Sequence, residues 1–206
     1  IKNGDILIVD GTMGVVIVNP DEDTLRIYQE EEKKLQGIAE KFLQVKDFPA
    51  VTLDGTTVEI TANIELPEEI TSVKIHGGQG IGLYRTEFFY MNRKDPPTEE
   101  EHFHAYKYVA EEMKPYSVII RTLDLGGDKF LSQFDMPKEI KPFLGWRAIR
   151  FCLARPDVFK MQLRAILRAS VFGKLKLMYP MISGIDELMQ ANSILDECKE
   201  ELRKLG

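Results

Sequence analysis

Tyr-Ser-Val-Ile-Ile-Arg-Thr-Leu-Asp-Leu-Gly-Gly-Asp-Lys (116–129) is the stretch of this 206-residue chain that decides its fold class. Residues 116–120 are apolar and rich in β-branched side chains, which is typical of a buried parallel strand. Arg121 follows directly, and the glycine pair at 126–127 lets the backbone approach a ligand closely. Because ligand sites of α/β sheets lie at the carboxyl ends of strands, the stretch predicts a strand and a binding loop.

Two further arginines occupy similar positions. Arg85 follows a shorter apolar run in Gly-Ile-Gly-Leu-Tyr-Arg-Thr-Glu-Phe (80–88), and Arg147 lies in Pro-Phe-Leu-Gly-Trp-Arg-Ala-Ile-Arg (142–150). Guanidinium is a permanent cation whose planar fork of donors suits carboxylate and phosphate groups. Several such groups at one mouth indicate a small ligand with more than one negative charge. The residues alone are equally consistent with a simpler interpretation, in which these are ordinary strand ends whose arginines are exposed to solvent.

The sequence before residue 49 predicts two elements. Short apolar runs at 5–10 and 15–18, separated by Gly11-Thr-Met-Gly14, predict a β-hairpin. Asn19 is expected to cap a helix over residues 20–45, whose polar middle suits a connector exposed to solvent.

The sequence after residue 49 alternates between strands and helices. Asp54-Gly55 predicts a hairpin turn whose second arm is the first strand of the series. The expected strands are 57–64, 81–84, 116–120 and 174–179, and the expected helices are 68–75, 98–113, a pair divided at Arg155-Pro156, and a last helix capped by Ser183. Such alternation predicts an α/β fold with parallel strands and crossover helices.

Composition excludes several classes of function. Lys and Arg number 27 against 33 Asp and Glu, and this net charge of −6 argues against binding to nucleic acid or a membrane surface. No apolar run approaches the ~20 residues of a membrane span. Cys152 and Cys198 show neither disulfide-framework nor zinc-site spacing. We expect a cytoplasmic protein, and the start at Ile1 predicts a piece of a longer chain.

The three arginine segments, in this order, resemble Enzyme I of the bacterial phosphoenolpyruvate:sugar phosphotransferase system. Gln-Leu-Arg-Ala-Ile-Leu-Arg-Ala-Ser (162–170) and Tyr-Pro-Met-Ile (179–182) extend the resemblance along essentially the whole chain. It implies a parent enzyme that transfers phosphate from phosphoenolpyruvate to its own histidine and then to the phosphocarrier protein HPr, which energises sugar uptake.

The resemblance also implies a domain organisation. Residues 1–19 would be the tail of the swivelling domain that carries the phosphorylated histidine, and residues 20–48 a linker helix. Residues 49–206 would form the first half of the phosphoenolpyruvate-binding (β/α)8 TIM-type barrel. Four strands of a closed sheet leave two open edges, so we expect the chain to self-associate.

The resemblance assigns Arg85 and Arg121 to phosphoenolpyruvate binding, with Arg147, Lys129 and Asn63 as further candidates. Thr86 and Glu87 are expected to support Arg85.

Asp124 and Asp128 would suit Mg²⁺ if taken by themselves. The family's magnesium ligands lie on later strands, beyond this chain. We therefore expect Asp124 and Asp128 to orient the arginines or brace the glycine loop, and we expect no metal site here.

No catalytic residue is expected inside the chain, which should be inactive alone. The family's acceptor histidine lies in a Thr-Ser-His motif, which His76, at a helix end, and His102 and His104, on the polar start of a helix, lack. The family's catalytic cysteine also lies later, and Cys152 is interpreted as a core residue.

Other functions remain open at this point. Lys160, Arg164 and Arg168 share a helical face, which we interpret as solvated rather than as a docking surface for HPr. The resemblance implies that HPr docks on a helical domain further toward the amino end, which this chain lacks. The alternatives for the whole are a nitrogen-branch paralogue, a pyruvate phosphate dikinase-like enzyme, or a non-catalytic anion-binding or assembly module.

Overall fold

The computed structural model describes residues 1–91, 93, 95–125 and 145–206. The chain divides into two compact units, residues 1–49 and 50–206. The division into three parts at residues 19 and 48 stays a prediction.

The first unit opens with an antiparallel hairpin of β1 (Leu7–Asp10) and β2 (Val15–Val18), in which Leu7 lies opposite Val18. The carboxylate of Asp10 closes the turn by accepting hydrogen bonds from the backbone amides of Thr12 and Met13, both at 2.9 Å. These bonds satisfy backbone donors that the hairpin ladder leaves free.

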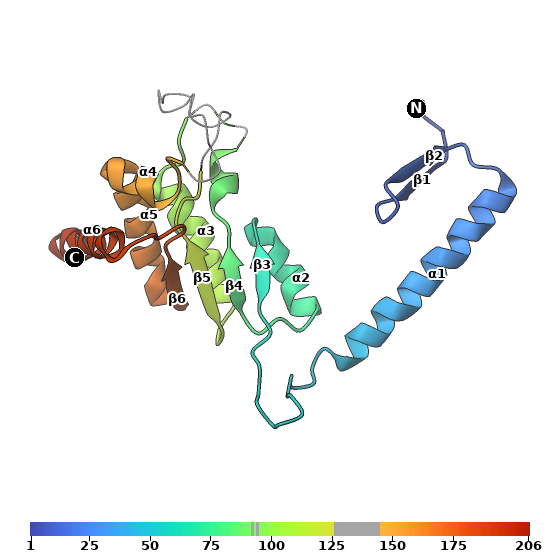
Figure 1. Ribbon diagram of the computed structural model, residues 1–206, viewed down its shortest axis with the longest axis horizontal. Helices are drawn as coiled ribbons and strands as arrows, with labels where there is room; N and C mark the ends of the chain where they lie inside the picture. The colour runs from blue at the N-terminus through green and yellow to red at the C-terminus, as the bar shows by residue number, and fades with distance from the viewer. Residues whose placement is uncertain (92, 94, 126–144) are drawn as a thin grey trace. The chain divides into compact units, whose positions relative to one another are not determined.

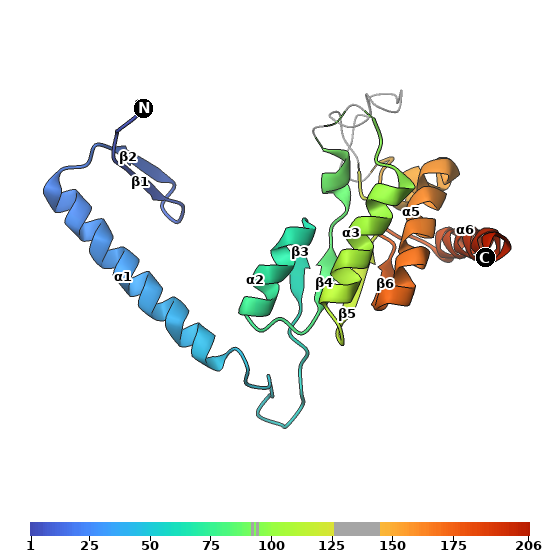
Figure 2. The same cartoon turned by 180° about the vertical axis from the view of Figure 1, so that it is seen from behind.

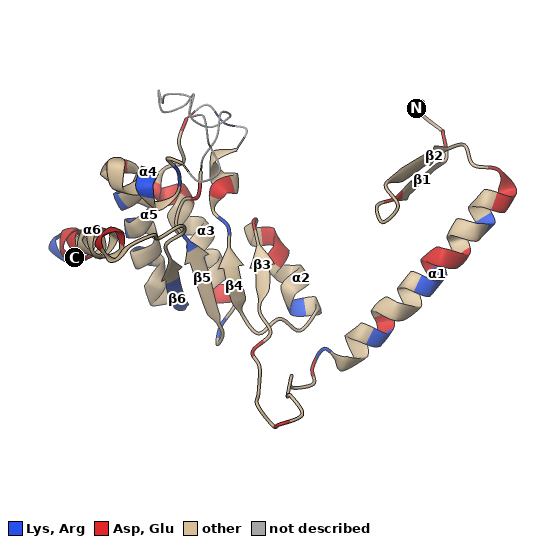
Figure 3. Cartoon of the chain, in the orientation of Figure 1, with Lys and Arg blue, Asp and Glu red and all other residues tan. Residues whose placement is uncertain are grey.

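The hairpin is followed by the long helix α1 (Glu22–Val45), in which no residue is buried. Its cap is Asp21, whose Oδ1 accepts from the amide of Thr24 at 2.8 Å. The prediction that Asn19 caps this helix is wrong, because the Asn19 side chain instead accepts from the amide of Ile6 at 3.0 Å. Basic and acidic residues are interleaved along α1, as expected for an exposed helix (Figure 3).

The second unit is built on a parallel sheet with the strand order β3-β4-β5-β6 (Figure 1). The strands are β3 (Ala62–Ile64), β4 (Ile81–Tyr84), β5 (Ser117–Arg121) and β6 (Lys174–Met178). Strand β5 pairs with β6 without a break, from Ser117 opposite Lys174 to Arg121 opposite Met178. The predicted parallel α/β fold is confirmed at this level.

The first strand is shorter than the expected 57–64, and the expected hairpin before it is reduced to a single bridge between Val51 and Thr57. Side chains of the turn accept hydrogen bonds from a backbone amide there. Asp54 Oδ1 and Thr52 Oγ1 both accept from the amide of Thr56, at 3.2 and 3.1 Å. Such local hydrogen bonds compete with a strand ladder.

Helices cover one face of the sheet, as the view from behind shows for α2, α3 and α5 (Figure 2). The helices and short 3₁₀ turns among the described residues of this unit are η1 (Pro67–Glu69), α2 (Ile70–Ile75), η2 (Glu87–Tyr90), α3 (Glu99–Glu112), α4 (Ile149–Ala154), α5 (Pro156–Ala169), η4 (Ser170–Phe172) and α6 (Ile185–Leu205). None of the helices in the described ranges is both long and apolar enough to cross a membrane.

The helix boundaries follow local chemistry. Thr98 and Glu101 form the expected capping box, in which Thr98 Oγ1 accepts from the Glu101 amide and Glu101 accepts from the Thr98 amide. The prediction that Ser183 caps α6 is wrong. Its amide and hydroxyl both donate to the carboxylate of Glu187, at 2.7 and 2.9 Å, and Gly184 takes the cap position.

Burial alternates along β5, where Val118 and Ile120 are fully buried toward the helices. They belong to a cluster that also contains Tyr84 of β4 and residues of the helical layer such as Tyr106. A second apolar cluster, which includes Leu123, Ile149, Cys152 and Phe159, lies under the loops that follow the strands. These two clusters fix the carboxyl edge of the sheet.

Lys160, Arg164 and Arg168 do not form the expected solvated face. Arg164 and Arg168 both pair with Glu99 of α3, at 2.7 and 2.9 Å, and Lys160 pairs with Glu201 of α6 at 2.8 Å. The three side chains are only 24–28% exposed. Acidic residues on both neighbouring helices therefore turn this stripe into a link between α3, α5 and α6.

We predict that Gly173→Ala destabilises the second unit. An alanine Cβ there would lie 2.4 Å from the carbonyl oxygen of Ala110, so that β6 and α3 would have to separate. Overpacking of this kind costs about 2 kcal/mol of unfolding free energy. Gly184→Ala is the control, since nothing lies within 4 Å of its added Cβ. Urea unfolding measures both, and equal losses would contradict the expected clash.

Candidate anion-binding site

Arg85 and Arg121 lie at the same edge of the sheet. Strands β4 and β5 are parallel neighbours, Arg85 directly follows β4, and Arg121 is the last residue of β5. Thr86 connects the two loops, because its hydroxyl donates to the carbonyl oxygen of Arg121 at 3.0 Å.

Two carboxylates hold the guanidinium of Arg121. Its Nη2 lies 2.8 Å from Glu87 Oε1, and its Nη1 lies 3.1 Å from Asp124 Oδ2. The Arg121 side chain is 19% exposed, and its buried Nε has no hydrogen-bond partner among the described residues. The two ion pairs fix the plane of the fork before any ligand binds.

Asp124 also holds Arg147, which lies just before α4. Both Nε and Nη2 of Arg147 contact Asp124 Oδ1, at 3.0 and 2.9 Å. One carboxylate therefore brings together two guanidinium groups from segments that are distant in sequence. This placement agrees with the expectation that Asp124 orients the arginines.

Arg85 is held more loosely. Its Nη1 pairs with Glu65 Oε1 at 2.7 Å, but the side chains are 44% and 51% exposed. An exposed pair of this kind stabilises by only about 0–1 kcal/mol, so Arg85 can exchange its partner at little cost. The expectation that Thr86 and Glu87 support Arg85 is wrong, because both contact Arg121.

Glu87 ties the loop after β4 to the loop after β5. Its Oε1 accepts from Arg121 Nη2 and, at 3.1 Å, from the backbone amide of Asp124. Burial raises the pKa of Glu87 above its usual value, although a backbone hydrogen bond and the charge of Arg121 act in the opposite direction.

No contact joins the remaining candidates to this cluster among the described residues. Asn63 is exposed within β3, one residue before the end of the strand. Lys129 and Asp128 lie outside the described residues. His76 lies at the end of α2 as expected, with its Nδ1 2.8 Å from the carbonyl oxygen of Ser72.

His102 lies at the polar start of α3, as expected, but its side chain is fully buried. Its ring lies between the hydroxyls of Tyr106 and Tyr90, at 2.9 Å from Nδ1 and 3.2 Å from Nε2. Burial lowers the pKa of His102 to about 4. His104, two residues later on α3, is exposed, and Cys152 is buried in the core as expected.

Gln162 of α5 is the site residue that the sequence reasoning missed. It is 1% exposed and contacts the loops after β4 and β5. The available signal was a single polar residue on the apolar face of a helix that otherwise buries Val158, Phe159, Leu163 and Ile166. A polar residue at such a position is usually hydrogen-bonded.

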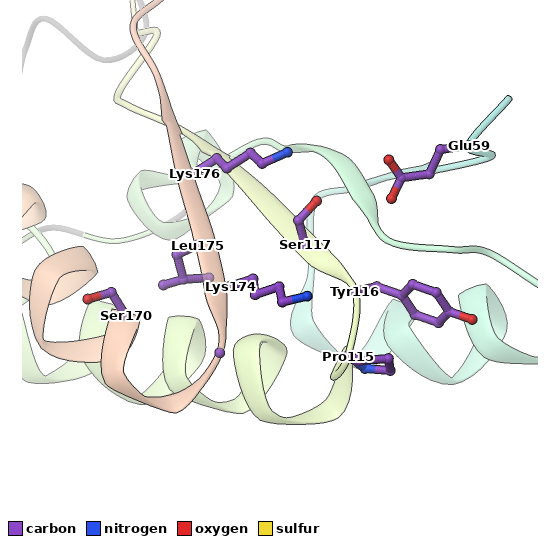
Figure 4. A pocket seen from close by; sticks show the side chains of 9 residues that line it. Glu59, Pro115, Tyr116, Ser117, Ser170, Lys174, Leu175 and Lys176 are labelled. Atoms are coloured by element: carbon purple, nitrogen blue, oxygen red, sulfur yellow. The ribbon is translucent and has the colours of Figure 1, made fainter. Parts of the chain in front are cut away.

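A separate hollow of about 590 Å³ lies at the opposite edge, by the amino ends of β5 and β6. Figure 4 shows Lys174 and Lys176 on one side of it and Glu59 on the other, with Ser117 between. Both lysines are exposed, so this hollow shows no built site comparable to the arginine cluster.

Fold and site together define a parallel α/β domain with a candidate site of paired arginines and carboxylates at the carboxyl edge of its sheet. Residues 39–206 match the family model described as PEP-utilising enzyme, PEP-binding domain, and the chain belongs to this family.

Similar proteins include those named phosphoenolpyruvate-protein phosphotransferase. The chain is 52% identical to that of Staphylococcus aureus (strain MSSA476), 50% to that of Bacillus sp. (strain S), and 48% to that of Staphylococcus carnosus (strain TM300). Each comparison covers 100% of this chain and 36% of the relative, so the chain spans about a third of their length.

We predict that His102 makes stability depend on pH. The folded-state pKa of His102, about 4, lies below the ordinary value of 6.5. The contribution of neutral His102 to the stability of the folded state is therefore complete above pH 6.5 and is lost as pH falls toward 4. Linkage gives a loss of about 2 kcal/mol in unfolding free energy between pH 7.5 and pH 5. Urea unfolding should show that His102→Gln removes this part of the pH dependence and that His104→Gln retains it. Parallel pH curves for wild type and His102→Gln would contradict the assignment.

Proposed function

We propose that this chain supplies the substrate-binding arginines of a phosphoenolpyruvate–protein phosphotransferase. The observation that carries the proposal is the placement of Arg121 and Arg147 on either side of Asp124, at the edge where Arg85 directly follows the neighbouring strand β4. Membership of the phosphoenolpyruvate-binding family and the names of the similar proteins support it.

Phosphoenolpyruvate presents a carboxylate and a phosphate on one small frame. Arg121, fixed by Glu87 and Asp124, offers a preset fork for one of these groups. Arg85, with its weak pair to Glu65, is free to turn toward the other. As the phosphoryl group leaves, charge spreads over its equatorial oxygens, and fixed guanidinium groups stabilise that charge.

Magnesium does not fit the residues described here. Glu87 and Asp124, the carboxylates nearest the arginines, are already paired with them. No group of three or more His, Cys, Asp or Glu side chains within the described ranges is placed to hold a metal. In our proposal the Mg²⁺ of the parent enzyme is held by residues beyond this chain.

The rest of the parent reaction is proposed on the same basis. Phosphate passes from phosphoenolpyruvate to a histidine of the parent and then to HPr, in a cytoplasmic sugar-uptake system. We assign residues 50–206 to the first half of a (β/α)8 barrel, since four consecutive parallel strands with helices on one face match half of that architecture. The hairpin of residues 7–18 belongs, in this proposal, to the swivelling domain.

A nitrogen-branch paralogue, a dikinase-like enzyme and a non-catalytic module are the alternatives. Transfer of phosphate to HPr from the protein as its gene encodes it separates the sugar-branch enzyme from all three. The identity of 52% to proteins named phosphoenolpyruvate-protein phosphotransferase favours a phosphotransferase over a dikinase-like enzyme or a non-catalytic module.

We predict that Arg121→Lys weakens phosphoenolpyruvate binding about 10- to 100-fold, because a point charge cannot replace paired hydrogen bonds to an anion. Calorimetric titration of the protein as its gene encodes it measures the dissociation constant. Arg203→Lys is the matched control, since Arg203 is exposed on α6 and pairs with Glu200 of the same helix. If both variants bind phosphoenolpyruvate like the wild type, the site is wrongly assigned.

We also predict that the 206-residue chain self-associates when it is produced alone. Within the part of the chain that the structure describes, strands β3 and β6 each have one neighbour in the sheet, and unpaired strand edges favour pairing with another chain. Sedimentation velocity at micromolar concentration should show dimers or larger species. A single monomeric species that unfolds cooperatively would be evidence against this expectation.

A further inference from the structure

The amide side chain of Gln162 bridges the loops that follow β4 and β5. Its Oε1 accepts from the backbone amide of Leu123 at 2.9 Å. Its Nε2 donates to the hydroxyls of Thr86 and Tyr106, at 3.0 and 3.2 Å. Gln162 and Thr86 are both buried, so these bonds are shielded from water.

The donors and acceptors of this bridge have one consistent direction. A backbone amide can only donate, so the oxygen of Gln162 faces Leu123 and its NH₂ group faces the two hydroxyls. The Thr86 hydroxyl, which accepts from Gln162, then donates its proton to the carbonyl oxygen of Arg121 at 3.0 Å. Both ends of the bridge thus reach the backbone around the site arginine.

The same direction continues on the other side of Gln162. The Tyr106 hydroxyl accepts from Gln162 and donates to Nδ1 of His102 at 2.9 Å. The neutral imidazole therefore carries its proton on Nε2, which donates to the Tyr90 hydroxyl at 3.2 Å. Each group has a defined role, so the orientation of Gln162 is fixed from both sides.

We propose that Gln162 and Thr86 are positioning residues for Arg121. Their hydrogen bonds hold the carbonyl of Arg121 and the amide of Leu123, the backbone groups on either side of Thr122. The backbone that carries the guanidinium is thereby fixed relative to the loop after β4. This inference rests on the proposed role of Arg121 in binding phosphoenolpyruvate. In an active site, a displacement of about 1 Å can lower the reaction rate about 100-fold.

Substitutions at Thr86 separate positioning from packing. Thr86→Val keeps the shape and removes the hydroxyl, whereas Thr86→Ser keeps the hydroxyl. We expect Thr86→Val to raise the dissociation constant for phosphoenolpyruvate about 10-fold and Thr86→Ser to restore it to within about 2-fold of wild type. Calorimetric titration of the protein as its gene encodes it gives these constants, and circular dichroism melting reports on the fold.

Thr122→Val is the matched control for Thr86→Val. Thr122 is equally buried and adjoins Arg121, but its hydroxyl has no partner among the described residues. We expect its dissociation constant to stay within about 2-fold of wild type. If Thr86→Val lowers the melting temperature while phosphoenolpyruvate affinity stays at the wild-type value, the role is purely structural and the proposal is overturned.

Gln162→Leu tests the same link from the helix side. We expect a similar loss of affinity, and we expect Thr86→Val combined with Gln162→Leu to lose little more than either alone, because both break one chain of hydrogen bonds. Losses that multiply would overturn the proposal. Arg121→Lys identifies which inference fails. Unchanged binding in that variant overturns the site itself, whereas weakened binding there with wild-type binding in Thr86→Val overturns positioning alone.

Discussion

One-sided burial of a parallel sheet is the constraint on which the other features of the second unit depend. Val118 and Ile120 face the helical layer and are fully buried, and the unbroken register of β5 and β6 places the partly buried Leu175 and Leu177 opposite them. Because the strands are parallel, every carboxyl end meets the same edge. Arg121 ends β5, so its placement at the site follows from the pairing of the strand.

The ion pairs at this edge hold Arg121 and Arg147 firmly and hold Arg85 only weakly. Arg121 and Arg147 share Asp124 in a partly buried cluster, where screening by solvent is weaker than at the surface. Arg85 and Glu65 are exposed, so their attraction is small. Beneath the cluster, Gln162 satisfies polar groups that would otherwise be buried without partners. The site is therefore rigid at one end and adaptable at the other.

The sequence predicted the features that follow from local patterns. The apolar run before Arg121 and the Thr98 capping box indicated their elements directly. The predictions were wrong or incomplete where the position of a side chain depends on a contact with a residue that is distant in sequence. Asn19 bonds to Ile6 rather than capping α1, His102 is buried between two tyrosines, and Glu99 of α3 neutralises arginines of α5. Spacing along one helix cannot reveal an acidic residue on its neighbour. In the same way, the position of Thr86 next to Arg85 in the sequence could not reveal that its hydroxyl donates to the carbonyl oxygen of Arg121 on the next strand.

The pairing of each site arginine with a carboxylate has a consequence for selectivity among anions. Arg85, Arg121 and Arg147 are balanced by Glu65, Glu87 and Asp124, so the described cluster carries no excess positive charge. A monovalent ion such as chloride gains little there, because it meets cations whose field is already compensated. A ligand with several negative oxygens can contact two or more guanidinium groups at once, and the sum of those contacts offsets the cost of sharing them with the resident carboxylates. In the proposed site, local neutrality would therefore favour compact anions with several charges over monovalent ions.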